Sequence, residues 1–255
     1  TTGRRLHLGY SFELLTDDFS ASYIRGTVER LEAQMTEGWP CWAISNHDVE
    51  RVLSRWGNGD ASPKLANLLT AMVCSLRGSV CVYRGEELAL TEAEVPYESL
   101  QDPYGIAFWP NFKGRDGCRT PMPWSDATHA GFSVGSPWLP VPADHASRSV
   151  QHQEGDPGSA LQGFRTFMHW RRQQPALCWG DIRFLDTAEP VLAFTRTLED
   201  TTVLAAFNLS AQPAALDVSA LGVLTPLDGH GLAQGRIDGG MLHLPGHAVI
   251  YAAIG

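Results

Sequence analysis

Three polar residues, Asn46, His47 and Asp48, directly follow an apolar run at residues 41–45 that has the length of a β-strand. In parallel α/β sheets, the C-terminal ends of buried strands are where ligands bind and where catalytic groups are carried. An amide, an imidazole and a carboxylate in that place indicate a functional site. Asn and Asp also favour turns and helix starts, so the alternative is that Asn46 and Asp48 only cap the next turn. The local pattern leaves both interpretations open.

The segments around this stretch alternate between strand and helix patterns. Residues 6–10, 41–45 and 79–83 are expected to be strands. A helical period with apolar residues on one face predicts a helix from Ser20 or Ser22 to Gly38, and a second from Ser62 to Gly78. This order is typical of parallel βαβ units with right-handed crossovers.

A long irregular segment and a second domain are expected after these units. Residues 85–157 lack a sustained helical period and are rich in Pro, Gly and Trp, which is typical of a functional loop. A third helix is expected at 158–174, ending before Pro175. Six short strand patterns separated by turn residues then predict an antiparallel β-sandwich: 182–185, 191–196, 202–208, 214–218, 241–244 and 248–254.

Composition narrows the class of partner. A net charge of −9 argues against nucleic acid, which needs a basic face, but raises no conflict with a neutral sugar. No apolar stretch reaches membrane-spanning length, so no membrane partner is expected. Five cysteines without a C-x-x-C pair, three of them in apolar runs (Cys41, Cys74 and Cys81), indicate reduced core residues of a cytoplasmic protein. The histidine spacing predicts no metal site, and the glycine-rich nucleotide-binding motifs are missing, so no cofactor is expected.

Three segments carry a resemblance to a known family. SNHDVER, at residues 45–51, resembles the fourth signature region of the α-amylase superfamily of glycoside hydrolases, where strand seven of a (β/α)8 barrel ends in His-Asp. YRGEELALTEAEVP, at 83–96, resembles the segment after barrel strand eight. YESLQDPYGIAFWPNFKGRDGCRTPMPW, at 97–124, is similar to a loop of the α-glucosidase and oligo-1,6-glucosidase branch.

The resemblance implies a partial fold. Residues 1–176 would be units six to eight of a (β/α)8 TIM barrel, with the long loop at 85–157, and residues 177–255 would be the family's C-terminal β-sandwich. A barrel closes only with eight strands, and three strands leave open sheet edges. We therefore expect a missing N-terminal half, present as further sequence, as a partner chain, or clipped from a precursor.

The resemblance also implies the chemistry of a retaining α-glucosidase that acts on short α-glucosides, by hydrolysis or by glucosyl transfer. Such an enzyme needs a carboxylate nucleophile and a carboxylic acid, which in the family lie on strands upstream of Thr1. Asp48 would be the third carboxylate, which stabilises the transition state, and His47 would orient the sugar. Arg115 would approach the active-site carboxylates or the sugar, and Glu92 would line the sugar-binding mouth.

Structural roles compete with these functional ones. Arg115 could instead tie the long loop to the barrel, and Arg119 is expected to serve loop architecture. Asp116 is a further candidate beside Arg115, whereas Glu86 and Glu87 are expected to be solvated or paired at the rim.

Two other functions stay open. One is a catalytically silent relative, in which the barrel is a scaffold or a partner subunit. The other takes His47 and Asp48 as the metal-binding pair of a phosphohydrolase. The sequence does not decide between α-1,4 and α-1,6 linkages, or between hydrolase and transglucosylase. The 255-residue chain by itself is expected to be inactive on an α-glucoside.

Overall fold

The structure is a computed structural model and describes residues 7–35 and 38–255. The chain forms two compact units. Unit 1 comprises residues 1–43, 67–81 and 164–255, and unit 2 comprises residues 44–66 and 82–163. The expected boundary between residues 176 and 177 stays a prediction.

Unit 1 contains a small parallel sheet. Its strands are β1 (Leu8–Tyr10), β2 (Trp39–Trp42) and β3 (Ser79–Val80), in the order β1-β2-β3. Both pairings are parallel, as the alternation of strands and helices predicts. The middle strand begins and ends earlier than expected, and the third strand is only two residues long. Leu6, the first residue of the predicted strand at 6–10, lies outside the described residues.

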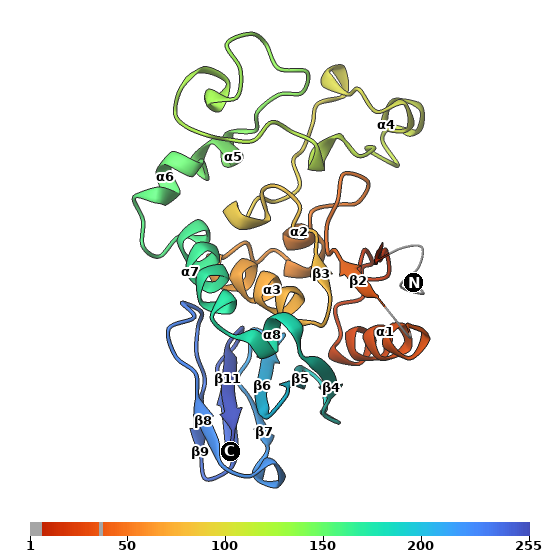
Figure 1. Ribbon diagram of the computed structural model, residues 1–255. Coiled ribbons are helices and arrows are strands. Elements are labelled where there is room, and N and C mark those ends of the chain that lie inside the picture. Colours follow the sequence, from red (N-terminus) through yellow and green to blue (C-terminus); the bar gives the residue numbers. More distant parts are fainter. Residues whose placement is uncertain (1–6, 36–37) are drawn as a thin grey trace. The chain divides into compact units, whose positions relative to one another are not determined.

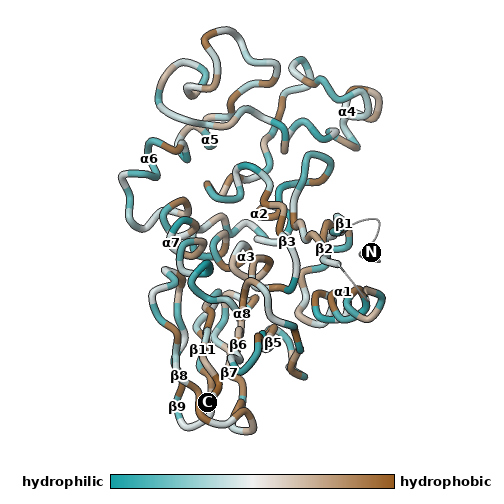
Figure 2. The backbone as a smooth tube through the Cα atoms, viewed as in Figure 1, coloured by the Kyte–Doolittle hydropathy of each residue, from teal (hydrophilic) through white to brown (hydrophobic). Residues whose placement is uncertain are grey.

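The two longest helices between these strands are α1 and α3 (Figure 1). Helix α1 (Ala21–Gln34) begins after Ser20, whose side chain accepts a hydrogen bond from the Tyr23 N–H. Ile24 and Val28, four residues apart, are fully buried, and Figure 2 shows apolar and polar residues alternating around this coil. Helix α3 (Pro63–Ser75) begins at the predicted Ser-Pro pair, where the Leu65 N–H donates to the Ser62 hydroxyl.

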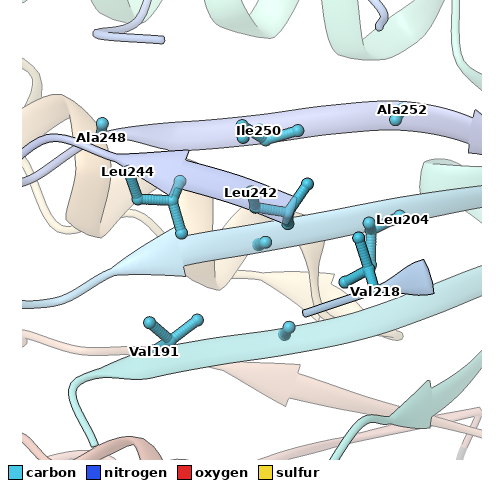
Figure 3. Packing of buried hydrophobic residues seen from close by; sticks show 10 residues of the cluster. Val191, Leu204, Val218, Leu242, Leu244, Ala248, Ile250 and Ala252 are labelled. Carbon is cyan, nitrogen blue, oxygen red and sulfur yellow. The ribbon is translucent and has the colours of Figure 1, made fainter. Parts of the chain in front are cut away.

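The C-terminal part of unit 1 is an antiparallel β-sandwich. One sheet has the order β4-β5-β6-β11-β8 and the other has the order β7-β10-β9. Side chains from both sheets share one core, which includes Val191, Leu204, Leu242 and Ile250 (Figure 3). The strands are β4 (Asp181–Phe184), β5 (Val191–Leu198), β6 (Thr201–Asn208), β7 (Ala214–Asp217), β8 (Leu224–Pro226), β9 (Arg236–Asp238), β10 (Met241–Leu244) and β11 (Val249–Ile254).

Six of these strands match the predicted ones, and β8 and β9 are additions. Each of the two added strands has three residues. A three-residue segment is too short to display alternation, so the sequence pattern could not indicate it.

Unit 2 is built from short helical segments joined by loops, in agreement with the missing helical period. Its longest complete helices are α2 (Val52–Gly57) and α4 (Pro103–Phe108), with six residues each. Leu88, Leu90, Met122 and Leu161 form one of its small cores. Further segments are η1 (Glu86–Leu88), η2 (Tyr97–Ser99), η3 (Asp116–Cys118), η4 (Thr128–Gly131), α5 (Ala143–Ser147) and α6 (Val150–Glu154).

The third predicted helix is α7 (Ala160–Arg172), and it ends before Pro175 as expected. Pro175 is itself the first residue of another short helix, α8 (Pro175–Trp179). The missing N–H of proline costs nothing at that position, because the first N–H groups of a helix have no partner within it.

One cysteine prediction is wrong. Cys41 and Cys74 are buried, but Cys81 is exposed, because it directly follows β3 at the edge of the three-stranded sheet. All five cysteines are free thiols. Across residues 7–35 and 38–255, we find no helix whose length and apolar character would let it cross a bilayer.

Candidate active site

The residues after β2 form a tight turn at the start of unit 2. The Asp48 N–H donates to the Asn46 side-chain oxygen at 2.8 Å, and the Val52 N–H donates to the Ser45 hydroxyl at 2.8 Å. Asn46 is therefore used as the turn cap that its residue type favours. The cap fixes the backbone and leaves the Asp48 carboxylate available for other contacts.

Two arginines from a distant loop hold the Asp48 carboxylate. Arg115 Nη1 and Arg119 Nη2 each donate to Asp48 Oδ1 at 3.1 Å. The second oxygen, Oδ2, lies 3.4 Å from His47 Nε2. The Asp48 side chain nevertheless stays 45% exposed. The carboxylate is thus held by two arginines and still has room to accept a further hydrogen bond.

Arg119, which was expected to serve loop architecture, also contacts the His47–Asp48 pair. In addition to its contact with Asp48, its Nε donates to the His47 carbonyl at 2.7 Å. Arg119 therefore contacts both the carboxylate and the backbone of the His47–Asp48 pair. These contacts span 71 and 72 residues of sequence, so no local pattern could indicate them.

Asp102, which the sequence reasoning missed, fixes the orientation of Arg115. Arg115 Nε donates to Asp102 Oδ2 at 2.8 Å and Nη2 donates to Oδ1 at 3.0 Å, a two-point ion pair. The Arg115 guanidinium holds the pKa of the buried Asp102 carboxyl well below its usual range. Asp102 is also the N-cap of α4, with Pro103 at the first helical position. The Asp-Pro pair at a helix start was the signal that could have identified it.

Asp116, a further candidate from the sequence, has a buried structural position and does not line the cavity beside Asp48. It is fully buried, and its Oδ2 accepts hydrogen bonds from the backbone N–H groups of Gln101 and Asp102. Asp116 thus fixes the segment that carries Asp102. Asp102 in turn contacts Arg115, which contacts Asp48.

A cavity of about 290 Å³ lies beside these residues in unit 2. Asp48, Arg115 and Glu92 line it, together with Glu50, Phe112 and Lys113. His47 contacts Asp48 but is not among the lining residues, and its side chain is 66% exposed. Asp48 thus lines a cavity and follows a strand that is parallel to both of its neighbours. Both features are expected of a ligand site at the C-terminal end of a parallel strand.

Two glutamates near the site are buried to an extent that the sequence does not reveal. Burial raises the pKa of Glu92 to about 7, and its Oε2 accepts a hydrogen bond from the Arg51 N–H at 2.9 Å. The expectation of a solvated side chain is wrong for Glu86, because both of its carboxyl oxygens are buried. Glu87 accepts a hydrogen bond from the Gly85 N–H. Direct contact of Glu92 with a sugar stays a prediction.

The site combines hydrogen-bonding groups with an aromatic ring. Asp48 supplies an acceptor and the arginines and His47 supply donors, while Phe112 supplies an apolar ring face beside the cavity. Within the part of the chain that the structure describes, no three His, Cys, Asp or Glu side chains are grouped so as to hold a metal ion.

Comparison with known proteins gives two family matches. The family described as alpha amylase, catalytic domain, matches residues 7–180, and the maltogenic amylase C-terminal domain matches residues 182–250. A probable alpha-glucosidase of Rhizobium meliloti (strain 1021) is 45% identical over 238 residues, which are 92% of this chain and 43% of that protein. An oligo-1,6-glucosidase of Parageobacillus thermoglucosidasius is 26% identical over 81% of this chain and 42% of its own length.

Solved structures agree with these matches. The alpha-glucosyl transfer enzyme XgtA is 58% identical, with a TM-score of 0.95 over 98% of this chain and 47% of that chain. The trehalulose synthase MutB of Pseudomonas mesoacidophila MX-45, at 23% identity and a TM-score of 0.83, shares the fold. The chain spans about half the length of the relatives that it matches. With its parallel sheet, its antiparallel β domain and these two matches, the chain belongs to the alpha-amylase family and corresponds to the C-terminal portion of its α-glucosidase members.

Proposed function

We propose that this chain is the C-terminal part of a retaining α-glucosidase that acts on short α-glucosides. In this proposal residues 1–176 complete a (β/α)8 catalytic barrel and residues 177–255 form its β-sandwich domain. The nucleophile and the acid/base belong to the N-terminal half, and Asp48 belongs to the same catalytic site. The five free thiols fit the reducing cytoplasm that the cysteine pattern predicts.

The observation that carries this proposal is the environment of Asp48. Its Oδ1 is held by Arg115 and Arg119, and its carboxylate remains partly exposed beside a cavity. In the proposed mechanism the carboxylate accepts hydrogen bonds from two neighbouring hydroxyls of the glucose ring. Those hydroxyls become stronger donors as positive charge develops on the ring, so the bonds tighten in the transition state and lower its energy.

His47 and Arg115 have supporting roles in this mechanism. The imidazole of His47 lies next to Asp48 Oδ2 and would donate to the same sugar hydroxyls, which would fix the orientation of the ring. Arg115, anchored by Asp102, keeps the Asp48 carboxylate in one orientation. Both roles need little movement during the reaction, because the groups are already in place.

The acceptor of the glucosyl group is either water or a second sugar hydroxyl. One relative, at 45% identity, is named a probable alpha-glucosidase, and another, at 58% identity, is named an alpha-glucosyl transfer enzyme. We propose that this chain contributes to either outcome through Asp48, since both reactions pass through the same charged sugar ring.

The test is a chimera that joins the N-terminal part of XgtA, which this chain does not match, to the 255 residues of this chain. We expect the chimera to release the chromophore from p-nitrophenyl α-glucoside, and the 255-residue chain alone to release none. In the chimera, Asp48→Asn should lower kcat by about 10² to 10³-fold, which is typical for loss of one transition-state contact.

Asp126→Asn is the matched control, because Asp126 is another exposed aspartate of unit 2 that lies outside the cavity lining. It should leave kcat unchanged. The proposal would be wrong if a folded, monodisperse chimera had no activity, or if Asp48→Asn were as active as the unmodified chimera. Robust turnover by the 255-residue chain alone would also overturn it.

A further inference from the structure

We propose that Glu92 is a positioning residue for this site: its carboxylate holds the 46–51 loop by the backbone of Arg51 and thereby fixes His47 and Asp48. This inference rests on the function proposed above. It differs from a direct contact between Glu92 and the sugar, and the two roles predict different results for one substitution.

Glu92 is attached at two points to the segment that follows Asp48. Its Oε2 accepts a hydrogen bond from the Arg51 N–H at 2.9 Å, and its own N–H donates to the Ser54 hydroxyl at 2.7 Å. Arg51 and Ser54 are the N-cap and an early residue of helix α2. The first N–H groups of a helix have no partner within it, so an anionic acceptor is well placed there. Glu92 therefore fixes the point where the Asp48 loop enters α2.

The other side of Glu92 packs against the loop that carries Arg115 and Arg119. A Cβ atom on Gly117 would lie 2.2 Å from Glu92 Oε1 and 2.6 Å from the Ala93 carbonyl, so only glycine fits there. The Ala93 N–H also donates to the Gly117 carbonyl at 3.3 Å. Glu92 thus lies between the two loops whose side chains meet at Asp48.

Arg51 continues this connection through its side chain. Its guanidinium is buried and donates to the Arg84 carbonyl at 2.9 Å and to the Cys118 carbonyl at 3.0 Å. Among the described residues, no carboxylate forms an ion pair with it. The Glu92 carboxylate instead accepts a hydrogen bond from the Arg51 backbone N–H. Through Arg51 and Glu92, the loops at 46–51, 84–85 and 115–119 are connected to one another.

The charge of Glu92 gives this role a property that simple packing does not have. Burial raises the pKa of Glu92 to about 7, and the Arg51 N–H and guanidinium oppose the rise. Other titratable groups that act on it are Glu50, Glu94 and Cys118. A carboxylate is a stronger acceptor than a carboxylic acid, so the hold on Arg51 should weaken as the pH falls through about 7.

The direct test is hydrogen exchange at the Arg51 amide in the 255-residue chain, compared between Glu92→Ala, Glu92→Gln and the control Glu98→Ala. Glu98 is an exposed glutamate of the same unit that lies outside this cavity. We expect Glu92→Ala to speed exchange at least about tenfold, because a charge-assisted hydrogen bond is lost. Glu92→Gln keeps an acceptor oxygen and should stay within about threefold of the unmodified chain.

The pH dependence separates positioning from packing. After correction for intrinsic exchange, protection of the Arg51 amide should fall between pH 8 and pH 5.5 in the unmodified chain and stay constant in Glu92→Gln. Unchanged protection in Glu92→Ala, or equal pH dependence in Glu92→Gln, would overturn the inference.

Kinetics in the chimera provide the second readout. Glu92→Ala should lower kcat about 10- to 100-fold with little change in KM, and Glu92→Gln should recover most of the loss. If Glu92→Gln raised KM as much as Glu92→Ala, the carboxylate would be a sugar contact and the inference would be wrong. If Asp48→Asn were fully active, the proposed function would fail instead, while the exchange result would still decide the role of Glu92.

Discussion

Two buried arginines, one in each unit, show how the same side chain serves stability in one region and site geometry in the other. Arg196 on β5 of unit 1 is fully buried, and Arg51 in unit 2 is 2% exposed. Among the described residues neither forms an ion pair, and both donate to backbone carbonyls. In both, the buried Nε lacks a hydrogen-bond partner.

The carbonyls that Arg196 binds lie at helix ends. Its Nη1 donates to the Ser75 and Leu177 carbonyls at 2.6 and 2.9 Å, and its Nη2 donates to the Gly180 carbonyl at 2.8 Å. Ser75 ends α3, and Gly180 is the C-cap of α8. The last carbonyls of a helix have no partner within it and carry partial negative charge, so a cation stabilises them. Burial lowers the pKa of Arg196 to about 10, which still leaves it charged at neutral pH.

Arg51 binds carbonyls in loops instead. Arg84 precedes the turn η1, and Cys118 belongs to the loop that carries Arg115 and Arg119. The carbonyl groups of a loop can accept hydrogen bonds from several alternative donors. A guanidinium in a fixed position therefore stabilises one loop conformation over the others. The comparison therefore predicts that Arg196 matters for stability alone, whereas Arg51 matters for stability and for the site.

The largest effect is expected for Arg196→Met. Three buried carbonyls lose their donor, which should lower the free energy of unfolding by about 4 kcal/mol. For a chain of this size that corresponds to a fall in Tm of about 10 °C. The check is thermal and urea unfolding of the 255-residue chain followed by circular dichroism.

The same substitution in the chimera should leave kcat per folded molecule unchanged, because the hydrogen-bond partners of Arg196 among the described residues are the carbonyls of Ser75, Leu177 and Gly180 and not site residues. A loss of kcat at a temperature where the variant is fully folded would break the distinction between the two arginines.

A smaller loss of stability, with a loss of activity, is expected for Arg51→Met. Two carbonyls rather than three lose their donor, so the free energy of unfolding should fall by about 3 kcal/mol. In the folded chimera kcat should fall about 100-fold, since the loops at 46–51 and 115–119 lose their shared anchor. Steady-state kinetics below the unfolding transition give the measurement.

Arg51→Lys is the matched variant, because it keeps the charge and removes the two-pronged donor geometry. It should retain part of the stability and little of the kcat. Full kcat in either variant would show that the loops keep their arrangement without the guanidinium, and Arg51 would then be equivalent to Arg196.

The sequence could predict the parts of this molecule that are set by local patterns. The helical faces of α1 and α3 and the long strands β5 and β6 show their periodicity over many residues. His47 and Asp48 were found because they interrupt an apolar run. Asp102, Arg119 and the backbone contact of Glu92 depend on pairings across 13 to 72 residues of loop. No periodicity encodes such pairings, so only the folded chain reveals them.

Acidic residues extend the comparison to the opposite charge. In unit 1, burial raises the pKa of Glu32, but Arg77 lies 3.0 Å away and opposes the rise. In unit 2, burial raises the pKa of Glu86 to about 8, and the Tyr83 N–H and the Ser45 hydroxyl offset only part of the rise. These two groups lie near the Glu86 carboxyl, but neither of its oxygens has a hydrogen-bond partner within normal distance and angle. The Arg51 guanidinium also opposes the rise, but among the described residues no cation forms a direct ion pair with Glu86, whereas Arg77 forms one with Glu32.

The smallest expected effect is the pH dependence that Glu86 contributes. A carboxyl whose pKa is raised in the folded state stabilises the fold below its unfolded pKa, near 4.5, and loses that stabilisation as the pH rises through about 8. The free energy of unfolding of the unmodified chain should therefore fall by roughly 2 to 3 kcal/mol between pH 5 and pH 9. The Glu86→Gln variant should not show this fall. Glu32→Gln should instead lower stability at both pH values, because Arg77 then loses its anionic partner. Equal pH dependence of urea unfolding in the unmodified chain and in Glu86→Gln would mean that the Glu86 carboxyl has a charged partner after all, and the contrast between the two buried acids would not hold.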